Sequence, residues 1–214
     1  MIIVLEGLDC SGKSTQAKLI SNQLTQLGIN NKWLHFPSLD KDSAFAEATG
    51  NLLQGKFGKL STLNPYLCAL VFAANQFSEK DKLIDDKVII LDRYFYSNMA
   101  YQAANLPTPA EKEAFTLWLA KAMLSDFTMP KGDLIFYLNV PEQAHQKLLQ
   151  QKIANKKNDI YEEEWQYQQQ VKAEYSRLAK LYNFICVDCG EGENMAAPHL
   201  INQRLMPHIL KKLE

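Results

Sequence analysis

The sequence lacks a charge imbalance and any long apolar run, and both absences limit the partners it can have. Its 214 residues carry a formal net charge of -1, which gives no bulk electrostatic case for nucleic acid or a membrane surface as a partner. No apolar run approaches the roughly 18 residues that a bilayer-spanning helix needs. The chain also passes from Met1 directly into a strand pattern, without a basic leader. We therefore expect a cytoplasmic protein that binds small molecules, with no nucleic-acid or membrane partner.

Cysteine is scarce and scattered. Four cysteines at these separations suit a reducing compartment better than a disulfide framework. Cys186 and Cys189 have C-x-x-C spacing, but they lie at the end of the apolar run 184–187, whereas a thioredoxin-like pair opens a helix. A zinc site needs a second ligand pair at matching spacing, so we expect a structural role for both thiols. We also expect ordinary core or surface roles for the histidines, which show no ligand spacing: His35, His145, His199 and His208.

The clearest motif is a phosphate loop near the start of the chain. Residues 7–14 read Gly-Leu-Asp-Cys-Ser-Gly-Lys-Ser and fill every fixed place of the pattern G-x-x-x-x-G-K-[ST]. The two glycines let backbone N–H groups converge on phosphate oxygens, together with the N-terminus of the helix that follows. Lys13 is then expected to reach the β- and γ-phosphates of a nucleoside triphosphate, and Ser14 to place its hydroxyl on Mg²⁺.

Apolar runs alternate with helical patterns along the chain. The runs typical of buried parallel strands are 2–5, 33–36, 88–91, 134–138 and 184–187. Between them, Asn64-Pro65 and the capping box from Thr108 to Glu111 mark helix starts, and an amphipathic pattern over 167–182 predicts a long helix. Alternating strands and helices predict one α/β domain over 1–214. Its core would be a doubly wound, parallel five-stranded sheet flanked by helices, with ligands beyond the carboxyl ends of the strands.

A lysine-rich segment late in the chain has weak apolar anchoring. Residues 150–159 include Lys152, Lys156 and Lys157. The segment reads either as a solvated turn or as a mobile lid over roughly 150–162, and both interpretations stay open here.

A second constellation follows the strand expected at 88–91. Asp92-Arg93-Tyr94 would lie at a carboxyl end of the sheet, facing the phosphate loop. Asp92 can hold Mg²⁺ through water or orient an attacking group, and the planar fork of Arg93 can clamp a second anion. The base-reading motif N-K-x-D of GTPases is absent, which favours a small-molecule kinase among phosphate-loop proteins.

Several further segments match the motifs of one family. They are Leu5 to Asp9 and Gly12 to Gln16, Phe36-Pro37, Phe72-Ala73-Ala74-Asn75, the block D-R-Y-x-x-S-x-x-A-Y-Q from Asp92 to Gln102, and Tyr161-Glu162. In these segments, spread over most of its length, the chain resembles the thymidylate kinase family.

The resemblance implies a P-loop nucleoside monophosphate kinase that transfers the γ-phosphoryl group of ATP to dTMP, giving dTDP for dTTP synthesis. It implies Mg²⁺ as cofactor and a homodimer. It assigns ATP binding to Gly7, Leu8, Asp9, Cys10, Ser11, Gly12, Lys13, Ser14 and Thr15. Acceptor binding falls to Asp9, Phe36, Pro37, Phe72, Asn75, Gln76, Arg93, Tyr94, Ser97, Tyr101, Gln102 and Tyr161.

The resemblance also implies individual roles. Asp9 would lie near the sugar hydroxyl of the acceptor, Phe72 would stack on the base, and Arg93 would hold the acceptor phosphate. Tyr101 would pack against the deoxyribose, where a 2′-hydroxyl fits poorly. The residues expected to act in catalysis are Lys13, Asp9, Arg93 and Asp92, with Ser14 and Asp92 toward the metal.

Arginine is the residue that the chain lacks where the family has it. Leu39, Gln76 and Cys10 stand at positions where family members carry arginines for the acceptor phosphate, the base edge and catalysis, and the lid carries none. Arginine occurs only at 93, 177 and 204. Because an arginine at the transferring phosphoryl group accelerates transfer by about 10³ to 10⁵, we hypothesise that a lid lysine replaces it. The candidates are Lys156 and Lys157, with Lys152 as the weaker one.

Two alternatives stay open. The chain could phosphorylate another (deoxy)nucleoside monophosphate or a deoxynucleoside, because the Gln76 amide both donates and accepts hydrogen bonds and suits more than one base. It could also be a nucleotide-binding module that has lost catalysis, as the missing arginines suggest. The intact Gly12-Lys13-Ser14 and Asp92-Arg93 count against that second alternative.

Overall fold

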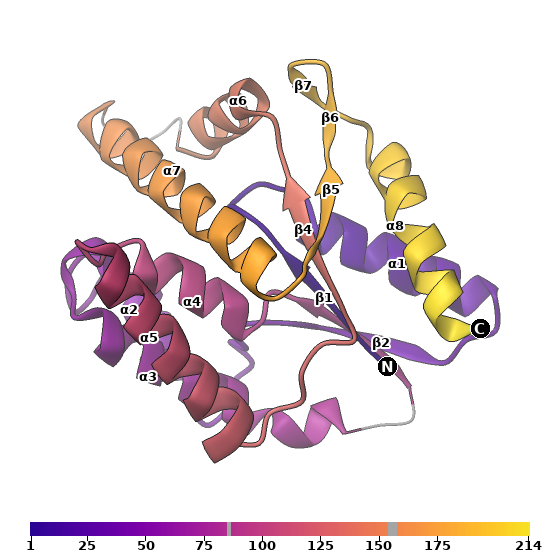
Figure 1. Ribbon diagram of the computed structural model, residues 1–214, viewed down its shortest axis with the longest axis horizontal. Helices are drawn as coiled ribbons and strands as arrows, with labels where there is room; N and C mark the ends of the chain where they lie inside the picture. The colour runs from indigo at the N-terminus through magenta and orange to yellow at the C-terminus, as the bar shows by residue number, and fades with distance from the viewer. Residues whose placement is uncertain (85–86, 154–157) are drawn as a thin grey trace.

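The computed structural model describes residues 1–84, 87–153 and 158–214, apart from the side chains of 61, 153 and 158–163 (Figure 1). The central sheet has five parallel strands in the order β2-β3-β1-β4-β5. They are β1 (Ile2–Glu6), β2 (Asn31–His35), β3 (Val88–Asp92), β4 (Leu134–Asn139) and β5 (Ile185–Asp188). The predicted fold class is confirmed, and the strand boundaries differ from the expected ones by a residue or two.

Helices connect the strands in the alternation that the sequence predicts. The α-helices are α1 (Lys13–Gln26), α2 (Ala46–Leu53), α3 (Pro65–Ser78), α4 (Phe95–Ala103), α5 (Pro109–Lys121), α6 (Glu142–Ile153), α7 (Asn158–Leu181) and α8 (Pro198–Leu213). Shorter turns are η1 (Leu60–Thr62), η2 (Lys80–Leu83) and the π-type segment η3 (Ala122–Asp126). A hairpin of β6 (Gly190–Glu191) and β7 (Asn194–Met195) follows the last strand of the sheet.

Both predicted helix starts are present. The Asn64 side chain accepts hydrogen bonds from the first N–H groups of α3, and Pro65 occupies the first helical position. Thr108 and Glu111 form the reciprocal capping box of α5. These local contacts satisfy N–H groups that have no partner inside the helix.

The sheet is covered on both faces. Along β1, Ile2 and Val4 pack into a core with residues of α3, α4, α5 and α7, whereas Ile3 and Leu5 pack toward α1 and α8. Figure 1 shows these two helical layers on opposite sides of the sheet. Successive side chains of a strand alternate between the faces, so a strand buried on both sides is apolar throughout, as 2–5 is.

Three observations bear on the opening expectations. Among the residues described, no helix has both the length and the hydropathy to cross a bilayer. All four cysteines are free thiols, and Cys189 is buried whereas Cys186 is exposed. In the described part of the chain, no cluster of three or more metal-ligating side chains occurs.

Candidate active site

The phosphate loop lies between the carboxyl end of β1 and the start of α1. Gly12 caps α1 with a left-handed backbone at φ 83°, and Gly7 has φ 152°. A Cβ atom at Gly7 would lie 2.7 Å from Ser11 Oγ and 3.0 Å from the Leu138 carbonyl oxygen, so both the positive φ and the close neighbours favour glycine. The sequence pattern therefore reflects a steric requirement as well as a phosphate site.

Lys13 folds back over this loop. Its Nζ donates hydrogen bonds to the carbonyl oxygens of Leu8 at 2.6 Å and Gly7 at 3.2 Å, and to Ser11 Oγ at 3.1 Å. Burial lowers the pKa of Lys13 to about 7, and the nearby charge of Arg93 acts in the same direction. The ammonium group is therefore held at the point where phosphates are expected, and the nearby carboxylates of Asp9, Asp92 and Glu6 offset the effect of burial on its pKa only in part.

Asp92 lies beside the first turn of α1. It is fully buried; its Oδ2 accepts a hydrogen bond from the Ser14 hydroxyl and lies 2.9 Å from His35 Nδ1. Burial raises the pKa of Asp92, but the hydrogen bonds from His35 and Ser14 outweigh burial and hold it below its ordinary value. Its Oδ1 has no hydrogen-bond partner among the described residues. A hydroxyl and a carboxylate side by side fit the hard oxygen ligands that Mg²⁺ prefers.

The contact between His35 and Asp92 was not expected from the sequence. His35 ends β2 and pairs directly with Asp92 at the end of β3. The contact could have been predicted only from the register of the two strands. Each residue is the last of its strand, and adjacent parallel strands end at the same edge of the sheet.

Arg93 joins the phosphate loop to the cavity beyond it. Its backbone has φ 70°, and its NH2 donates to Asp9 Oδ1 at 2.6 Å. Its NH1 donates to the Gly7 carbonyl oxygen and to Ser97 Oγ, each at 3.2 Å. The guanidinium lies 5.2 Å from the ring centroid of Tyr101, and the Tyr101 hydroxyl donates to Asp9 Oδ1 at 3.0 Å. These contacts fix the orientation of the guanidinium.

Asp9 is held by a cation on each oxygen. Arg93 contacts Oδ1, and the Nζ of Lys152 on α6 lies 2.7 Å from Oδ2. Burial raises the pKa of Asp9, but the charges of Arg93 and Lys152 outweigh it and keep the pKa well below the usual range of the carboxyl group. Of the lid lysines considered from the sequence, Lys152 reaches the loop, whereas Lys156 and Lys157 lie outside the described residues.

Glu6 at the end of β1 contacts the residues that support Arg93, and this role was not predicted from the sequence. The buried carboxylate accepts from the backbone N–H groups of Tyr94 at 2.8 Å and Ser97 at 3.2 Å, from the Ser97 hydroxyl and from the Tyr175 hydroxyl at 2.9 Å. Burial raises the pKa of Glu6 and outweighs the hydrogen bonds from the Ser97 hydroxyl, the Tyr175 hydroxyl and the Tyr94 N–H and the charge of Arg93, which lower it. Glu6 thus anchors the N-terminus of α4, next to Arg93.

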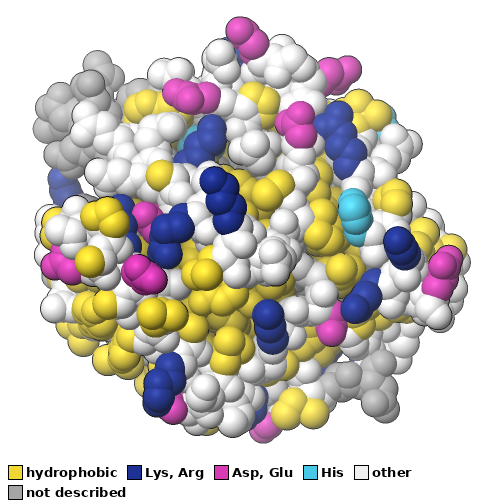
Figure 2. All heavy atoms as spheres, in the orientation of Figure 1, with side chains coloured by type: hydrophobic (Ala, Val, Ile, Leu, Met, Phe, Trp, Pro, Cys, Tyr) yellow, Lys and Arg dark blue, Asp and Glu magenta, His cyan; other side chains and the backbone are white. Residues whose placement is uncertain are grey.

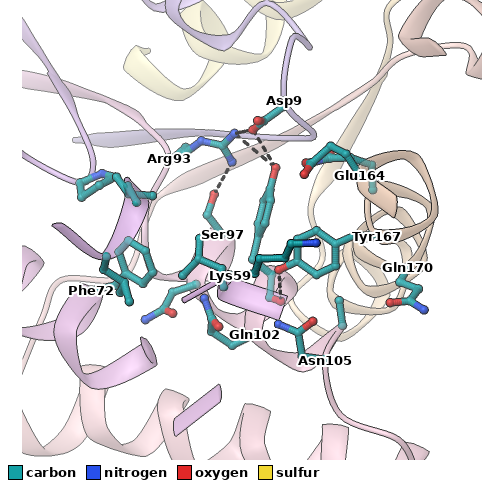
Figure 3. Close-up of a pocket in the computed structure, with 18 of the residues that line it drawn as sticks. Asp9, Lys59, Phe72, Arg93, Ser97, Gln102, Asn105, Glu164, Tyr167 and Gln170 are labelled. Atoms are coloured by element: carbon teal, nitrogen blue, oxygen red, sulfur yellow. Dashed lines mark hydrogen bonds and ion pairs between the residues drawn. The ribbon is translucent and has the colours of Figure 1, made fainter. Parts of the chain in front are cut away.

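A cavity of about 1160 Å³ opens beyond Arg93. Most residues expected to bind the acceptor line it: Asp9, Phe36, Pro37, Phe72, Gln76, Arg93, Tyr94, Ser97, Tyr101 and Gln102. The lid lysine Lys152 also lines the cavity. Other lining residues were not expected, among them Lys59, Asn105, Glu164, Tyr167 and Gln170 (Figure 3). The expected residue Tyr161 lies outside the described side chains.

Asn75 does not line this cavity. Its amide oxygen accepts from the Ser38 N–H and its amide nitrogen donates to the Ser38 carbonyl oxygen, both at 2.8 Å. These paired bonds hold the segment after β2 against α3. Asn75 therefore acts on the cavity through the backbone beside Pro37.

Two buried amides face the cavity with unused hydrogen-bonding capacity. Gln76 Oε1 and Gln102 Oε1 have no partner among the described residues, and both residues line the cavity, as Phe72 does. An aromatic face beside a few convergent polar groups is the usual composition of a small-molecule site.

A comparison with family models shows to which family the chain belongs. Residues 5–196 match the thymidylate kinase model. The chain belongs to the thymidylate kinase family. It is an ATP-dependent nucleoside monophosphate kinase that phosphorylates dTMP to dTDP, and the resemblance seen in the sequence is confirmed.

Relatives in this family match over most of the chain. The probable thymidylate kinase of Thermococcus kodakarensis is 32% identical over 192 residues, covering 85% of each chain. The human thymidylate kinase is 32% identical over 143 residues, covering 65% of this chain and 60% of the human one. The solved structure of thymidylate kinase from Candida albicans superposes with a TM-score of 0.72 at 25% identity, covering 99% of this chain and 91% of that chain.

The positions that depart from the family pattern lie in distinct places. Gln76 faces the cavity, whereas Leu39 is exposed and does not line it. Cys10 lies in the phosphate loop with φ 61°, and burial raises the pKa of its thiol. A thiol carries no positive charge in either protonation state, so Cys10 supplies no cation at the position where the resemblance implies an arginine.

Proposed function

We propose that the chain binds MgATP on the phosphate loop and dTMP in the cavity beyond Arg93, and transfers the phosphoryl group at the point where the two sites meet. The observation that carries this is the Gly7 carbonyl oxygen, which accepts hydrogen bonds from both Lys13 Nζ and Arg93 NH1 at 3.2 Å. One cation belongs to the donor loop and the other to the acceptor cavity. Two phosphate groups brought to this point would each find a cation that offsets their mutual repulsion.

On the donor side, the residues of the phosphate loop from Gly7 to Thr15 hold the ATP phosphates. Lys13 exchanges its carbonyl contacts for phosphate oxygens, which stabilise its charged form. Ser14 and Asp92 would hold Mg²⁺, the latter directly or through water. When bound, the ion neutralises charge on the β- and γ-oxygens.

On the acceptor side, Phe72 stacks on the base, and the amides of Gln76 and Gln102 pair with its O4 and N3–H groups. Arg93 holds the acceptor phosphate, and the Asp9 carboxylate accepts a hydrogen bond from the sugar hydroxyl. Tyr101, pinned between Arg93 and Asp9, packs where a 2′-hydroxyl would project. The same side of the cavity is completed by four further lining residues, Phe36, Pro37, Tyr94 and Ser97.

We assign the missing arginine's charge to Lys152. Its Nζ lies 2.7 Å from the carboxylate of Asp9, and Asp9 lies between the proposed donor and acceptor sites. The proposed lid over 150–162 carries Lys152 at its start, and its closure would exclude water, so that ATP is not hydrolysed. Lys156 and Lys157 remain predictions, as do the single-domain assignment and the cytoplasmic location.

We also propose that the chain forms a homodimer through α3. Leu67, Leu70 and Phe77 recur at helical spacing on α3 and are exposed. Figure 2 shows hydrophobic side chains gathered over the region where α2, α3 and α5 lie. Light scattering should give twice the mass of one chain, and Leu70→Glu should reduce it to one. A wild-type monomer at micromolar concentration would contradict the proposal.

A coupled assay of ADP release with a panel of acceptors tests the proposed function. We expect dTMP to give the highest kcat/KM. Faster turnover with dUMP, dCMP or thymidine would favour a kinase with another acceptor. Measurable ATP binding without turnover of any acceptor would favour a nucleotide-binding module.

A further inference from the structure

His145 on α6 is a buried histidine that the proposed mechanism does not use. Its relative exposure is 1%, and neither ring nitrogen has a hydrogen-bond partner among the residues that the structure describes. Buried polar groups nearly always have a partner in folded proteins. A histidine kept in such a place therefore needs an explanation, because an apolar side chain would fill the same volume without losing hydrogen bonds.

The face of α6 that carries His145 is directed at one residue of the phosphate loop. His145, Leu149 and Lys152 follow each other at spacings of four and three, which places them on one side of the helix. Leu149 is buried and lines the cavity, and Lys152 Nζ lies 2.7 Å from Asp9 Oδ2. Two turns earlier, His145 lies near the backbone of that same Asp9, which acts on the pKa of its ring.

The imidazole is neutral in these surroundings. Burial lowers the pKa of His145 and outweighs the Asp9 backbone and carboxylate, which raise it; the charges of Lys172 and Lys13 contribute smaller decreases. A neutral imidazole has one N–H donor and one acceptor nitrogen. It can therefore offer a hydrogen bond to a carbonyl oxygen without bringing a charge to the loop.

On its other side, the ring packs against Trp165 of α7. The ring centroids are 5.6 Å apart and the planes are inclined by 35°. The proposed lid over 150–162 includes the end of α6 and the start of α7, and these two helices lie side by side (Figure 1). The imidazole thus lies between the lid-bearing helices and the phosphate loop.

We propose that His145 is a positioning residue for the phosphate loop: its ring N–H donates to the Asp9 carbonyl oxygen when α6 packs onto the ATP-loaded loop. Because the peptide bond is trans, the Cys10 N–H points opposite to the Asp9 carbonyl. A hydrogen bond on that carbonyl therefore fixes the direction in which the Cys10 N–H is presented to a phosphate oxygen. Cys10 has φ 61°, a conformation that non-glycine residues rarely adopt. A hydrogen bond from outside the loop would therefore help to stabilise this peptide.

This inference rests on the proposed ATP site, and two variants of the full chain test it. His145→Gln keeps an N–H donor, whereas His145→Phe keeps an aromatic ring against Trp165 without any donor. Calorimetry measures the affinity of each variant for ATP alone, and the dTMP affinity serves as the internal reference. The comparison separates the effect of the ring hydrogen bond from the effect of ring packing. We expect His145→Phe to bind ATP about 3- to 10-fold more weakly, the loss of one net hydrogen bond. His145→Gln should stay within about twofold of wild type by the same arithmetic, and dTMP affinity should be unchanged in both.

Equal ATP affinities in the two variants would overturn the proposal. If both affinities are weakened equally, packing of the ring explains the loss; if both are unchanged, His145 does not act on ATP binding. Nitrogen NMR of the wild-type ring keeps the test independent of how the variants fold. Addition of ATP should shift one protonated ring nitrogen toward a hydrogen-bonded position, and an unshifted signal would also overturn it. Intact ATP binding without dTMP phosphorylation would refute the proposed function and leave this inference standing.

Discussion

Replacing Lys152 by alanine should slow phosphoryl transfer while leaving the fold intact. The Lys152 side chain is 55% exposed and its ion pair with Asp9 measures 2.7 Å. Exposed ion pairs contribute about 0 to 1 kcal/mol to stability, so the melting temperature should barely change. We expect the contribution of Lys152 to catalysis to be larger, because its ammonium charge would stabilise the γ-phosphoryl group in the transition state.

The size of the catalytic effect follows from distance and exposure. A unit charge about 4 Å from another in an effective dielectric of about 20 interacts by about 4 kcal/mol. Screening at a half-exposed side chain reduces this to about 2 kcal/mol, which corresponds to about a 30-fold loss in kcat. Lys152→Arg should keep the rate at or above that of wild type, because a guanidinium retains the charge and adds a planar fork.

Coupled ADP release at saturating ATP and dTMP measures this effect. Lys121→Ala is the matched control, because Lys121 pairs with Asp126 at 2.8 Å on the surface of another helix and should leave kcat unchanged. A kcat for Lys152→Ala within twofold of wild type, with an unchanged melting temperature, would refute the assignment of the missing charge to this lysine.

Three other residues give sharp expectations. Because the pKa of Lys13 is about 7 without ligand and phosphates raise it, ATP binding should take up a proton above pH 7, and affinity should fall as pH rises. Calorimetry in buffers of different ionisation enthalpy measures this uptake, and Lys13→Arg should abolish it; a pH-independent affinity would contradict the site. Phe72→Ala should raise the dTMP KM about tenfold through lost stacking with little change for ATP, whereas equal effects on both would place Phe72 in the core. Glu6→Ala removes the acceptor of buried donors and should cost about 3 kcal/mol of unfolding free energy in urea; a loss below about 1 kcal/mol would show that those donors find other partners.

Local patterns were reliable where local physics decides the outcome. The caps at Asn64 and Thr108 form because their side chains satisfy N–H groups of the next turn. The strand runs were found because a strand buried on both faces must be apolar throughout. Asp92 and Arg93 could be assigned to the ligand edge because the carboxyl ends of parallel strands meet there.

The supporting residues could not be found in this way. His35 meets Asp92 through strand register, and Glu6 meets Tyr94 and Tyr175 through the packing of α4 and α7. Asn75 was expected at the acceptor, but its amide holds Ser38. Side chains of these types have many local uses, and nothing nearby in the chain distinguishes one from another.

The sequence by itself determined the phosphate loop, the parallel sheet and the family, because these depend on short motifs and on the period of apolar residues. Only the tertiary structure brings one of the lid lysines to the phosphate loop, and on this contact rests our proposal that Lys152 replaces the absent arginines. Lys152 reaches Asp9 because α6 lies over the loop, and the same helix face brings His145 to the Asp9 backbone. Charge and hydrogen bonding act over a few ångströms, so which lysine or histidine matters depends on the distance in space.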